Sequence, residues 1–291
     1  MRTGVDTRCC CTAWLGVRLS VGTVQRCLLE AARASDAVEE QLVEAVLDAP
    51  LLHADETAHP ERGQALWLWV FVSASTVVFY VGHRSKEIVT NLLGDDYTGW
   101  LMSDGYGVYR EYARRLRCWA HLLRKAKGLE ASFEPQACEF GRETRALLER
   151  LMDAVYAARE SPGEALEVRY ADTLAAFAAR CARARDSGHA NTRALAVELL
   201  RDWAAIFAVL AHPELPLTNN EAERMLRHWV IWRRISHGTR TAVGSRTFAL
   251  LASVIETCRR RAHSPWAYLA AVIAAARAGV AVPRLAPASG P

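Results

Sequence analysis

Three carboxylates stand at positions from which they could hold divalent metal ions together. Asp55 follows the short apolar run Leu51–Ala54. Asp104 follows the apolar segment Trp100–Ser103 and precedes Gly105, which permits a sharp turn. An acid at a strand end lies at the edge of a sheet, and two such acids meet if their strands are neighbours. Taken alone, each acid is better explained as a turn residue or a helix cap, but the two together favour a shared site.

Glu223 is the third candidate, because it begins a segment with helical character. Positions two apart on a helix point to nearly opposite sides, so only one of Glu221 and Glu223 can face a sheet. The apolar residues at 222, 226 and 229 favour Glu223 as the one that does. The alternative is a capping box, in which Asn220 is the N-cap and Glu223 bonds back to the helix.

Three carboxylates supply the oxygen ligands that Mg²⁺ or Mn²⁺ prefers. Two ions held in this way can clamp the attacking and leaving oxygens of an in-line phosphoryl displacement. The long gap between Asp104 and Glu223 requires that a separate block of chain is inserted between the two ligands.

The pattern of strand-like and helix-like segments around these acids predicts an α/β fold with a mixed sheet flanked by helices. Residues 1–50 are expected to form a helical segment. Residues 51–129 and 213–275 are expected to form the core, with a helical insertion at 130–212 and a flexible tail at 276–291. Within the core we expect strands over 66–72 and 77–81, a helix over 108–116 and a short strand over 117–120.

The uncharged stretch from Ala65 to Gly82 is nearly long enough to cross a membrane. Its β-branched and aromatic residues, and the polar break from Ser73 to Thr76, favour two buried strands instead. No membrane partner is therefore expected.

Near the N-terminus, residues 16–26 are compatible with half of a helix-turn-helix, although a helix capped by Ser20 or Thr23 is favoured.

Basic residues gather after Glu223, where residues 223–261 hold nine arginines and two glutamates. Forked guanidinium groups match phosphate oxygens, so this imbalance favours contact with the DNA backbone over simple pairing on a solvated helix face. The predicted DNA-binding residues are Arg224, Arg227, Arg233, Arg234, Arg240 and Lys125.

The cysteines and the overall composition bound the class of protein. Apolar residues make up 51% of the 291 residues, and the net charge is +4, which does not by itself indicate a nucleic-acid partner. The eight cysteines, three of them consecutive at 9–11, form neither CxxC pairs nor a disulfide framework. Cys118 and His121 could bind a metal, but a buried thiol and a hydrogen-bonded imidazole are favoured. We expect a reduced, cytoplasmic protein.

Six strings, in order along residues 15–275, resemble the catalytic region of insertion-sequence-66-type transposases of the DDE class. They begin at Leu52 (LHADET), Leu66 (LWLWV), Ser103 (SDGY), Cys118 (CWAH), Asn219 (NNEAER) and Pro265 (PWAYL). The resemblance implies an RNase H-like core with a helical insertion before the last acid. It also implies that Asp55, Asp104 and Glu223 are the catalytic acids and hold two Mg²⁺ or Mn²⁺ ions.

The implied activity is DNA cleavage at transposon ends followed by strand transfer. The implied partners are transposon-end and target DNA, with further copies of the chain on that DNA; a need for accessory proteins is left open. The chain differs from the family pattern at Thr218, where an acid is usual, and at Arg234-Ile235, where Lys-Asn is usual. It also begins almost at the catalytic region, so recognition of transposon ends is expected to be absent.

Two other functions compete with transposition. A truncated, catalytically silent copy would act only as a DNA-binding or inhibitory protein, and a plasmid cleavage assay separates it from an active enzyme. A structure-selective nuclease of the same fold would cut without strand transfer, and joining assays with precut ends identify it.

Overall fold

The computed structural model describes residues 16–161, 163 and 165–287, and the chain forms two compact units. The first unit comprises residues 1–99 and 221–291, and the second comprises residues 100–220. Both contain strands and helices, which confirms the mixed α/β class. The four-part division and the RNase H-like core stay predictions. The three consecutive cysteines lie outside the described residues.

The first unit is organised around three antiparallel strands: β1 (Leu51–Glu61), β2 (Gln64–Val72) and β3 (Val77–Gly82). A two-residue loop joins β1 to β2, where Arg62 and Gly63 both adopt positive φ angles of 44° and 87°. Such a loop matches the twist of a tight hairpin. It lets β1 continue well past Ala54, so the expectation that this strand ends at Asp55 is wrong.

The apolar stretch 65–82 forms β2 and β3, as predicted. Its polar break makes the turn between them, in which the Ser73 N–H donates to the Thr76 carbonyl at 2.8 Å. In the described part of the chain, no helix combines the length and apolar character that a membrane crossing requires.

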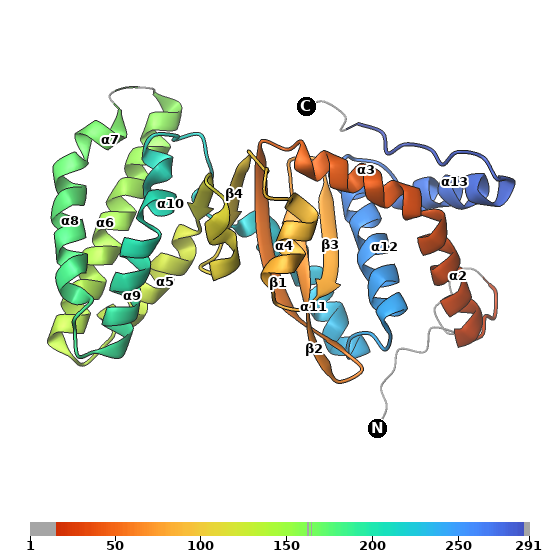
Figure 1. The fold of residues 1–291 in the computed structure, drawn as a ribbon, viewed down its shortest axis with the longest axis horizontal. Helices are drawn as coiled ribbons and strands as arrows, with labels where there is room; N and C mark the ends of the chain where they lie inside the picture. The colour runs from red at the N-terminus through yellow and green to blue at the C-terminus, as the bar shows by residue number, and fades with distance from the viewer. Residues whose placement is uncertain (1–15, 162, 164, 288–291) are drawn as a thin grey trace. The chain divides into compact units, whose positions relative to one another are not determined.

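Two helices cover one face of this sheet: α11 (Asn220–Ser236) and α12 (Ala242–Arg260). Figure 1 shows α4 (Lys86–Leu93) in front of the strands and α11 behind them. The buried core between α11, α12 and the sheet contains Leu68, Val70, Val72, Val77, Phe79, Ala222, Leu226, Ala249 and Ala252. Alternate residues of β2 and β3 supply the strand side of this core, as expected for a sheet with one face packed on helices.

Two hydroxyl groups of α12 also form hydrogen bonds with the backbone at the outer edge of β3. The backbone N–H of Val77 donates to Thr257 Oγ1 at 3.0 Å, and that of Phe79 donates to Ser253 Oγ at 2.8 Å. Thr257 also donates to the Val77 carbonyl at 3.1 Å. Backbone groups that would otherwise remain unpaired at a sheet edge are thereby satisfied.

The remaining helices of this unit are α2 (Val21–Ala34), α3 (Asp36–Leu47) and α13 (Pro265–Ala278). Ser20 caps α2 by accepting a hydrogen bond from the Thr23 N–H at 3.1 Å, which confirms the capped-helix interpretation. Helix α4 was not anticipated from the sequence.

The C-terminal residues up to 287 are held in place, contrary to the expected flexible tail. Arg261 donates to the carbonyls of Leu285 at 3.3 Å and Ala286 at 2.9 Å. The Tyr268 hydroxyl donates to the Pro283 carbonyl at 2.9 Å. These bonds tie an irregular segment to α12 and α13, which composition alone did not reveal.

The second unit begins with a parallel pair of strands, β4 (Trp100–Ser103) and β5 (Arg115–Arg117), joined through the 3₁₀ turn Gly107–Glu111. The helix expected over 108–116 and the strand expected over 117–120 are therefore wrong. The strand ends two residues before α5 (Trp119–Glu130) begins. Arg117 misleads a pattern-based prediction because it is buried through ion pairs rather than exposed.

Helices dominate the rest of this unit, as predicted for residues 130–212. They are α6 (Pro135–Glu160), α7 (Leu166–Arg169), α8 (Ala171–Ala184), α9 (Ala190–Arg201), α10 (Trp203–Phe207) and the 3₁₀ turn Ala208–Leu210. The Trp119 indole N–H donates to the Ile206 carbonyl at 2.9 Å, which links α5 to α10.

The two ends of the second unit meet within it. The Cys118 N–H donates to the Ser103 carbonyl at 3.0 Å, and the Trp119 N–H donates to the Leu217 carbonyl at 2.9 Å. Near the other end, the Asn219 N–H donates to Cys118 Sγ at 3.3 Å. The chain therefore enters and leaves this unit at neighbouring points.

Candidate active site

Asp55 lies in the middle of β1 and is half-buried. It pairs directly with Val70 of β2, so its side chain shares the sheet face that α11 and α12 cover. His53 and Thr57 occupy the same face by strand alternation. One carboxylate oxygen, Oδ1, accepts a hydrogen bond from the Glu56 N–H at 2.9 Å.

Glu223 lies in the first turn of α11, beside the buried Ala222. Ala222 and Leu226 fix the buried side of α11 against the sheet core, as the apolar spacing predicted. Asp55 and Glu223 line one solvent-accessible cavity of about 420 Å³ in the first unit. Its other lining residues are Glu56, Thr57, Leu226, Arg227, Val230, Ile231 and Arg234.

Glu221 takes part in a different set of contacts. It pairs with Arg260 at 2.7 Å and with Arg224 at 3.4 Å. The hydrogen bond from Arg260 is the main reason that the pKa of Glu221 is lowered. Helix α11 begins at Asn220, with Glu221 and Glu223 both in its first turn. Glu221 therefore has a structural ion pair, whereas Glu223 shares a cavity with Asp55.

Asp104 directly follows β4, as predicted, and is half-buried in the second unit. Its Oδ1 accepts a hydrogen bond from the Tyr106 N–H at 2.7 Å, which forms a turn closed by the aspartate side chain. The structure thus brings Asp55 and Glu223 to one cavity in the first unit and places Asp104 at a strand end in the second.

The Cys118 thiol is buried and accepts a hydrogen bond from the Asn219 N–H. The interpretation of Cys118 as a structural thiol rather than a metal ligand stays a prediction. His121 lies half-buried in the first turn of α5. Cys118 in the second unit and Cys258 in the first are both fully buried, and burial raises the pKa of the Cys258 thiol.

The basic residues predicted to bind DNA fall into two groups. Arg227, Arg234 and Arg240 are exposed and form no ion pair with any described residue. Arg224 pairs with Glu221, and Lys125 pairs with Glu198 at 2.5 Å. Lys125 and Arg224 are therefore already partly neutralised, which the count of charges along the sequence did not show.

Arg233 is intermediate between these groups. Its Nη1 donates to Thr57 Oγ1 at 3.2 Å, beside Asp55 on β1. Burial, with a smaller contribution from the charge of Arg234, lowers the pKa of Arg233. Arg233 thus links α11 to the strand that carries Asp55.

Other arginines of the basic segment have structural partners. Arg246 pairs with Asp36 at 2.7 Å, and Arg259 pairs with Glu256 at 2.9 Å. Together with the Arg260–Glu221 pair and the buried Arg261, they show that partners can come from distant segments. The excess of arginine over glutamate within 223–261 therefore overstates the charge available to DNA.

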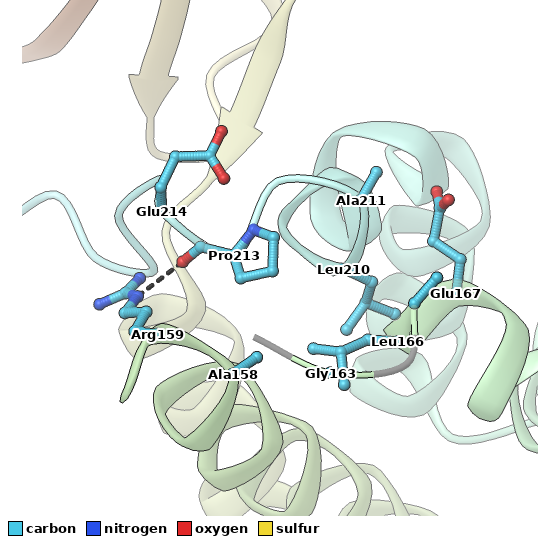
Figure 2. A pocket seen from close by; sticks show the side chains of 10 residues that line it. Ala158, Arg159, Gly163, Leu166, Glu167, Leu210, Ala211, Pro213 and Glu214 are labelled. Atoms are coloured by element: carbon cyan, nitrogen blue, oxygen red, sulfur yellow. Dashed lines mark hydrogen bonds between the residues drawn. The ribbon is translucent and has the colours of Figure 1, made fainter. Parts of the chain in front are cut away.

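A cavity of about 660 Å³ in the second unit is lined by none of the predicted site residues. Figure 2 shows Arg159 at its rim, where Nε donates to the Pro213 carbonyl at 2.6 Å. Nη2 of the same side chain donates to the Leu215 carbonyl at 2.6 Å. Arg159 is thereby occupied by backbone carbonyls, and the carboxylates of Glu167 and Glu214 also line this cavity.

A buried ionic cluster in the second unit was missed by the sequence analysis. Asp202 follows α9 and pairs with Arg110, Arg115 and Arg117, which surround the turn after Asp104. The alternation of arginines at 115 and 117 was the available signal, but its acidic partner lies far along the sequence.

Comparison with known proteins decides the family. The model described as "Transposase IS66 family" matches residues 10–247, which is most of the chain. The chain belongs to the IS66 family of transposases. This confirms the resemblance carried by the six sequence strings.

Two curated relatives of this IS66-family chain are uncharacterized proteins of Sinorhizobium fredii. The protein y4jO is 29% identical over 180 residues, which cover 61% of this chain and 52% of y4jO. The protein y4qI is 24% identical over 264 residues, which cover 79% of this chain and 48% of y4qI. The chain thus spans about half the length of these relatives.

Proposed function

We propose that this chain is the catalytic part of a DNA transposase, which cleaves DNA strands at transposon ends and transfers them to a target. Membership of the IS66 family supports the transposase role. The observation that carries the catalytic assignment is the shared cavity of Asp55 and Glu223, which come from a strand and a helix far apart in the sequence. Asp104, at the end of β4, completes the proposed set of acids.

The donor set fits a hard divalent cation. Asp55, Asp104 and Glu223 offer only carboxylate oxygens, the ligands that suit Mg²⁺ or Mn²⁺. Bound ions, in our proposal two, would activate the attacking oxygen and stabilise the leaving oxygen of a phosphoryl displacement. The protein's part is to hold the three carboxylates in fixed directions. Backbone N–H groups already orient Asp55 and Asp104.

The cavity also has a cationic wall. Arg227 and Arg234 line it together with Asp55 and Glu223, and both arginines are exposed. Guanidinium groups beside the acids would attract a DNA phosphate and keep it near the reacting position. The proposed DNA-binding surface also includes Arg233 and Arg240. We expect them to contribute less than Arg227 and Arg234, because Arg233 donates to Thr57 and Arg240 lies outside this cavity.

The order of elements supports an RNase H-like core as part of the proposal. Three antiparallel strands are followed by a helix and then by a parallel pair of strands, with a helical block before the helix that carries Glu223. We further propose that copies of the chain assemble on the DNA, since strand transfer joins two DNA sites.

Replacing each acid by its amide tests the catalytic assignment. Asp55→Asn, Asp104→Asn and Glu223→Gln should each reduce Mg²⁺-dependent nicking of a supercoiled plasmid by at least about 100-fold, because a lost ligand removes transition-state stabilisation. Asp96→Asn, which changes an exposed loop carboxylate, is the matched control and should cut at the wild-type rate.

Glu221→Gln separates the two glutamates of α11. It should lower the melting temperature, because it breaks the pairs with Arg260 and Arg224, and should leave nicking intact. A dead Glu221→Gln alongside an active Glu223→Gln would reverse the assignment. Wild-type protein that binds DNA but never nicks it would instead support the silent, DNA-binding alternative.

A further inference from the structure

The centre of the ionic cluster around Asp202 is almost completely shielded from solvent. The Asp202 and Arg117 side chains are each 1% exposed. Asp202 Oδ1 accepts from Arg110 Nε at 3.1 Å and from Arg115 Nη2 at 3.2 Å, while Oδ2 lies 3.4 Å from Arg117 Nε. Arg117 also donates to Glu198 on α9. All these residues belong to the second unit.

Burying a cluster of charges of this kind costs folding free energy. Removing charges from water carries a penalty that a buried pair often fails to recover, and apolar residues of similar volume are frequently as stable. With Lys125 on Glu198, four cations face two carboxylates. Burial alone would raise the pKa of Asp202, but the hydrogen bond from Arg110 and the nearby guanidinium charges lower it overall, so Asp202 is ionised.

The cluster encloses the turn that follows Asp104. Arg110 Nη2 lies 3.4 Å from the Gly105 carbonyl oxygen, to which it donates. A Cβ atom added at Gly105 would lie 2.7 Å from Arg117 Nη1 and 3.0 Å from Glu198 Oε1. A side chain at position 105 would therefore have to displace the ends of Arg117 and Glu198. Arg117 also pairs in register with Ser103, the residue before Asp104.

We propose that Arg110 and Arg117, anchored by Asp202, are positioning residues that fix the direction of the Asp104 carboxylate toward a divalent cation. The proposal rests on the proposed role of Asp104 as a metal ligand. Arg110 holds the carbonyl on one side of the turn, and Arg117 closes the space on the other side. The helical block thereby contributes to the site through Asp202, although no helix of that block carries one of the three acids.

The direction in which Arg110→Gln changes cation affinity distinguishes a positioning role from a purely electrostatic one. Arg110→Gln removes a positive charge near Asp104, so electrostatics alone would tighten the binding of a cation. Loss of the hydrogen bond to Gly105 would instead loosen the turn and weaken cation binding. Outer residues that orient metal ligands typically contribute 10–100-fold to metal affinity or activity.

Mn²⁺ binding to the full chain, with a double-stranded oligonucleotide present, supplies a readout that does not depend on turnover. Electron paramagnetic resonance of free Mn²⁺ would give the dissociation constant for the wild type, Arg110→Gln and Asp104→Asn. We expect Arg110→Gln to weaken Mn²⁺ binding about 10-fold. Arg201→Gln removes the same charge from an exposed position next to Asp202 and should leave binding unchanged or slightly tighter.

Gly105→Ala provides a second test without any change of charge. Its Cβ would push against Arg117 and should weaken Mn²⁺ binding in the same direction. Arg110→Gln should remain folded, because Arg110 is 32% exposed and Asp202 keeps its other two arginines. Near-ultraviolet circular dichroism checks this point.

The failures of the two proposals are distinguishable. If Asp104→Asn weakens Mn²⁺ binding but Arg110→Gln binds as tightly as the wild type or tighter, the positioning role is wrong and the metal site stands. If Asp104→Asn binds Mn²⁺ like the wild type, Asp104 is not a ligand, and both the positioning role and the proposed catalytic set fail.

Discussion

Asp55 and Glu223 reach one cavity because two independent periodicities agree. Strand alternation turns Asp55 toward α11, and the helical repeat turns Ala222 and Leu226 onto the sheet. Glu223 then falls beside the buried side of the helix rather than on its exposed side. A shift of one residue in either element would move its acid away from the other, so the register of the β1–β2 hairpin is part of the site.

The arginines differ in what they can give to DNA. A guanidinium that already holds a carboxylate releases less free energy on meeting a phosphate, because it must exchange one anionic partner for another. Arg227 and Arg234 carry no such partner among the described residues and share the cavity with Asp55 and Glu223. They are therefore the residues through which salt dependence should be most visible.

Replacing both Arg227 and Arg234 by glutamine should flatten the slope of log DNA affinity against log salt concentration by about 1.8, or about 0.9 for each lost phosphate contact. The loss should be similar for unrelated DNA sequences, because phosphate contacts carry no sequence information. Fluorescence anisotropy over a salt series measures the slope. Arg246→Gln with Arg277→Gln, which removes two ion-paired arginines, is the control. Equal slopes in the two double variants would place Arg227 and Arg234 off the DNA path.

The sequence was sufficient to propose the three acids but not their surroundings. Asp104 was correctly placed directly after a strand, because the apolar run before it and Gly105 after it are local signals. Asp55 was expected at a strand end, yet the polar run after it continues as strand. Asp202 could not be linked to the site, because its partners come from a turn and a strand far away in the chain.

At the scale of elements, the fit between α12 and β3 depends on matching two repeats. Four residues of a helix rise about 6 Å, and two residues of a strand rise about 6.6 Å. Ser253 and Thr257 are therefore spaced to meet the N–H groups of Val77 and Phe79. The same helix contributes apolar side chains to the core, so a single element satisfies both the face and the edge of the sheet.

Removing these hydroxyls should destabilise the protein. Ser253→Ala and Thr257→Val each leave a backbone N–H without its acceptor, and each should cost about 1–3 kcal/mol of unfolding free energy. Urea denaturation followed by circular dichroism measures the loss. Ser161→Ala, an exposed position, should change stability by less than about 0.5 kcal/mol. Losses no larger than those of Ser161→Ala would show that water replaces the hydroxyls.

Among the elements, those with a local apolar signal were the ones correctly predicted. β2 and β3 were recognised from their β-branched and aromatic residues, and α2 from its cap. The end of β1 was missed because Arg62-Gly63 is not a common hairpin sequence, although both residues adopt the positive φ angles of such a turn. β5 was misplaced because its arginines suggest exposure, while ion pairs with the helical block bury Arg117.

At the scale of the molecule, the second unit has the properties of an insertion. Ser103 near its start and Leu217 near its end both bond to the segment at Cys118 and Trp119. A unit whose ends are adjacent can be accommodated within another domain at little conformational cost. Its core, in which Trp119 is fully buried, is built from its own residues.

Residues 100–220 should therefore fold when expressed alone. The fragment should show helical circular dichroism and a single cooperative melting transition, because the buried Trp119 side chain contacts Ile206 and Phe207 of the fragment itself. Replacing Trp119 by alanine in the fragment should abolish the transition or lower its midpoint strongly, since truncating a buried aromatic side chain costs about 3–5 kcal/mol. A fragment that melts gradually without a transition would show that the unit depends on the rest of the chain.

The hydrogen bonds between α12 and the edge of β3 also affect whether two molecules can associate through their sheets. An exposed strand edge is a template onto which another chain can add its own strand, and unprotected edges promote aggregation. Here the outward N–H groups of Val77 and Phe79 are already occupied by α12. At these two positions another chain could extend the sheet by backbone pairing only if the hydrogen bonds to α12 were first broken.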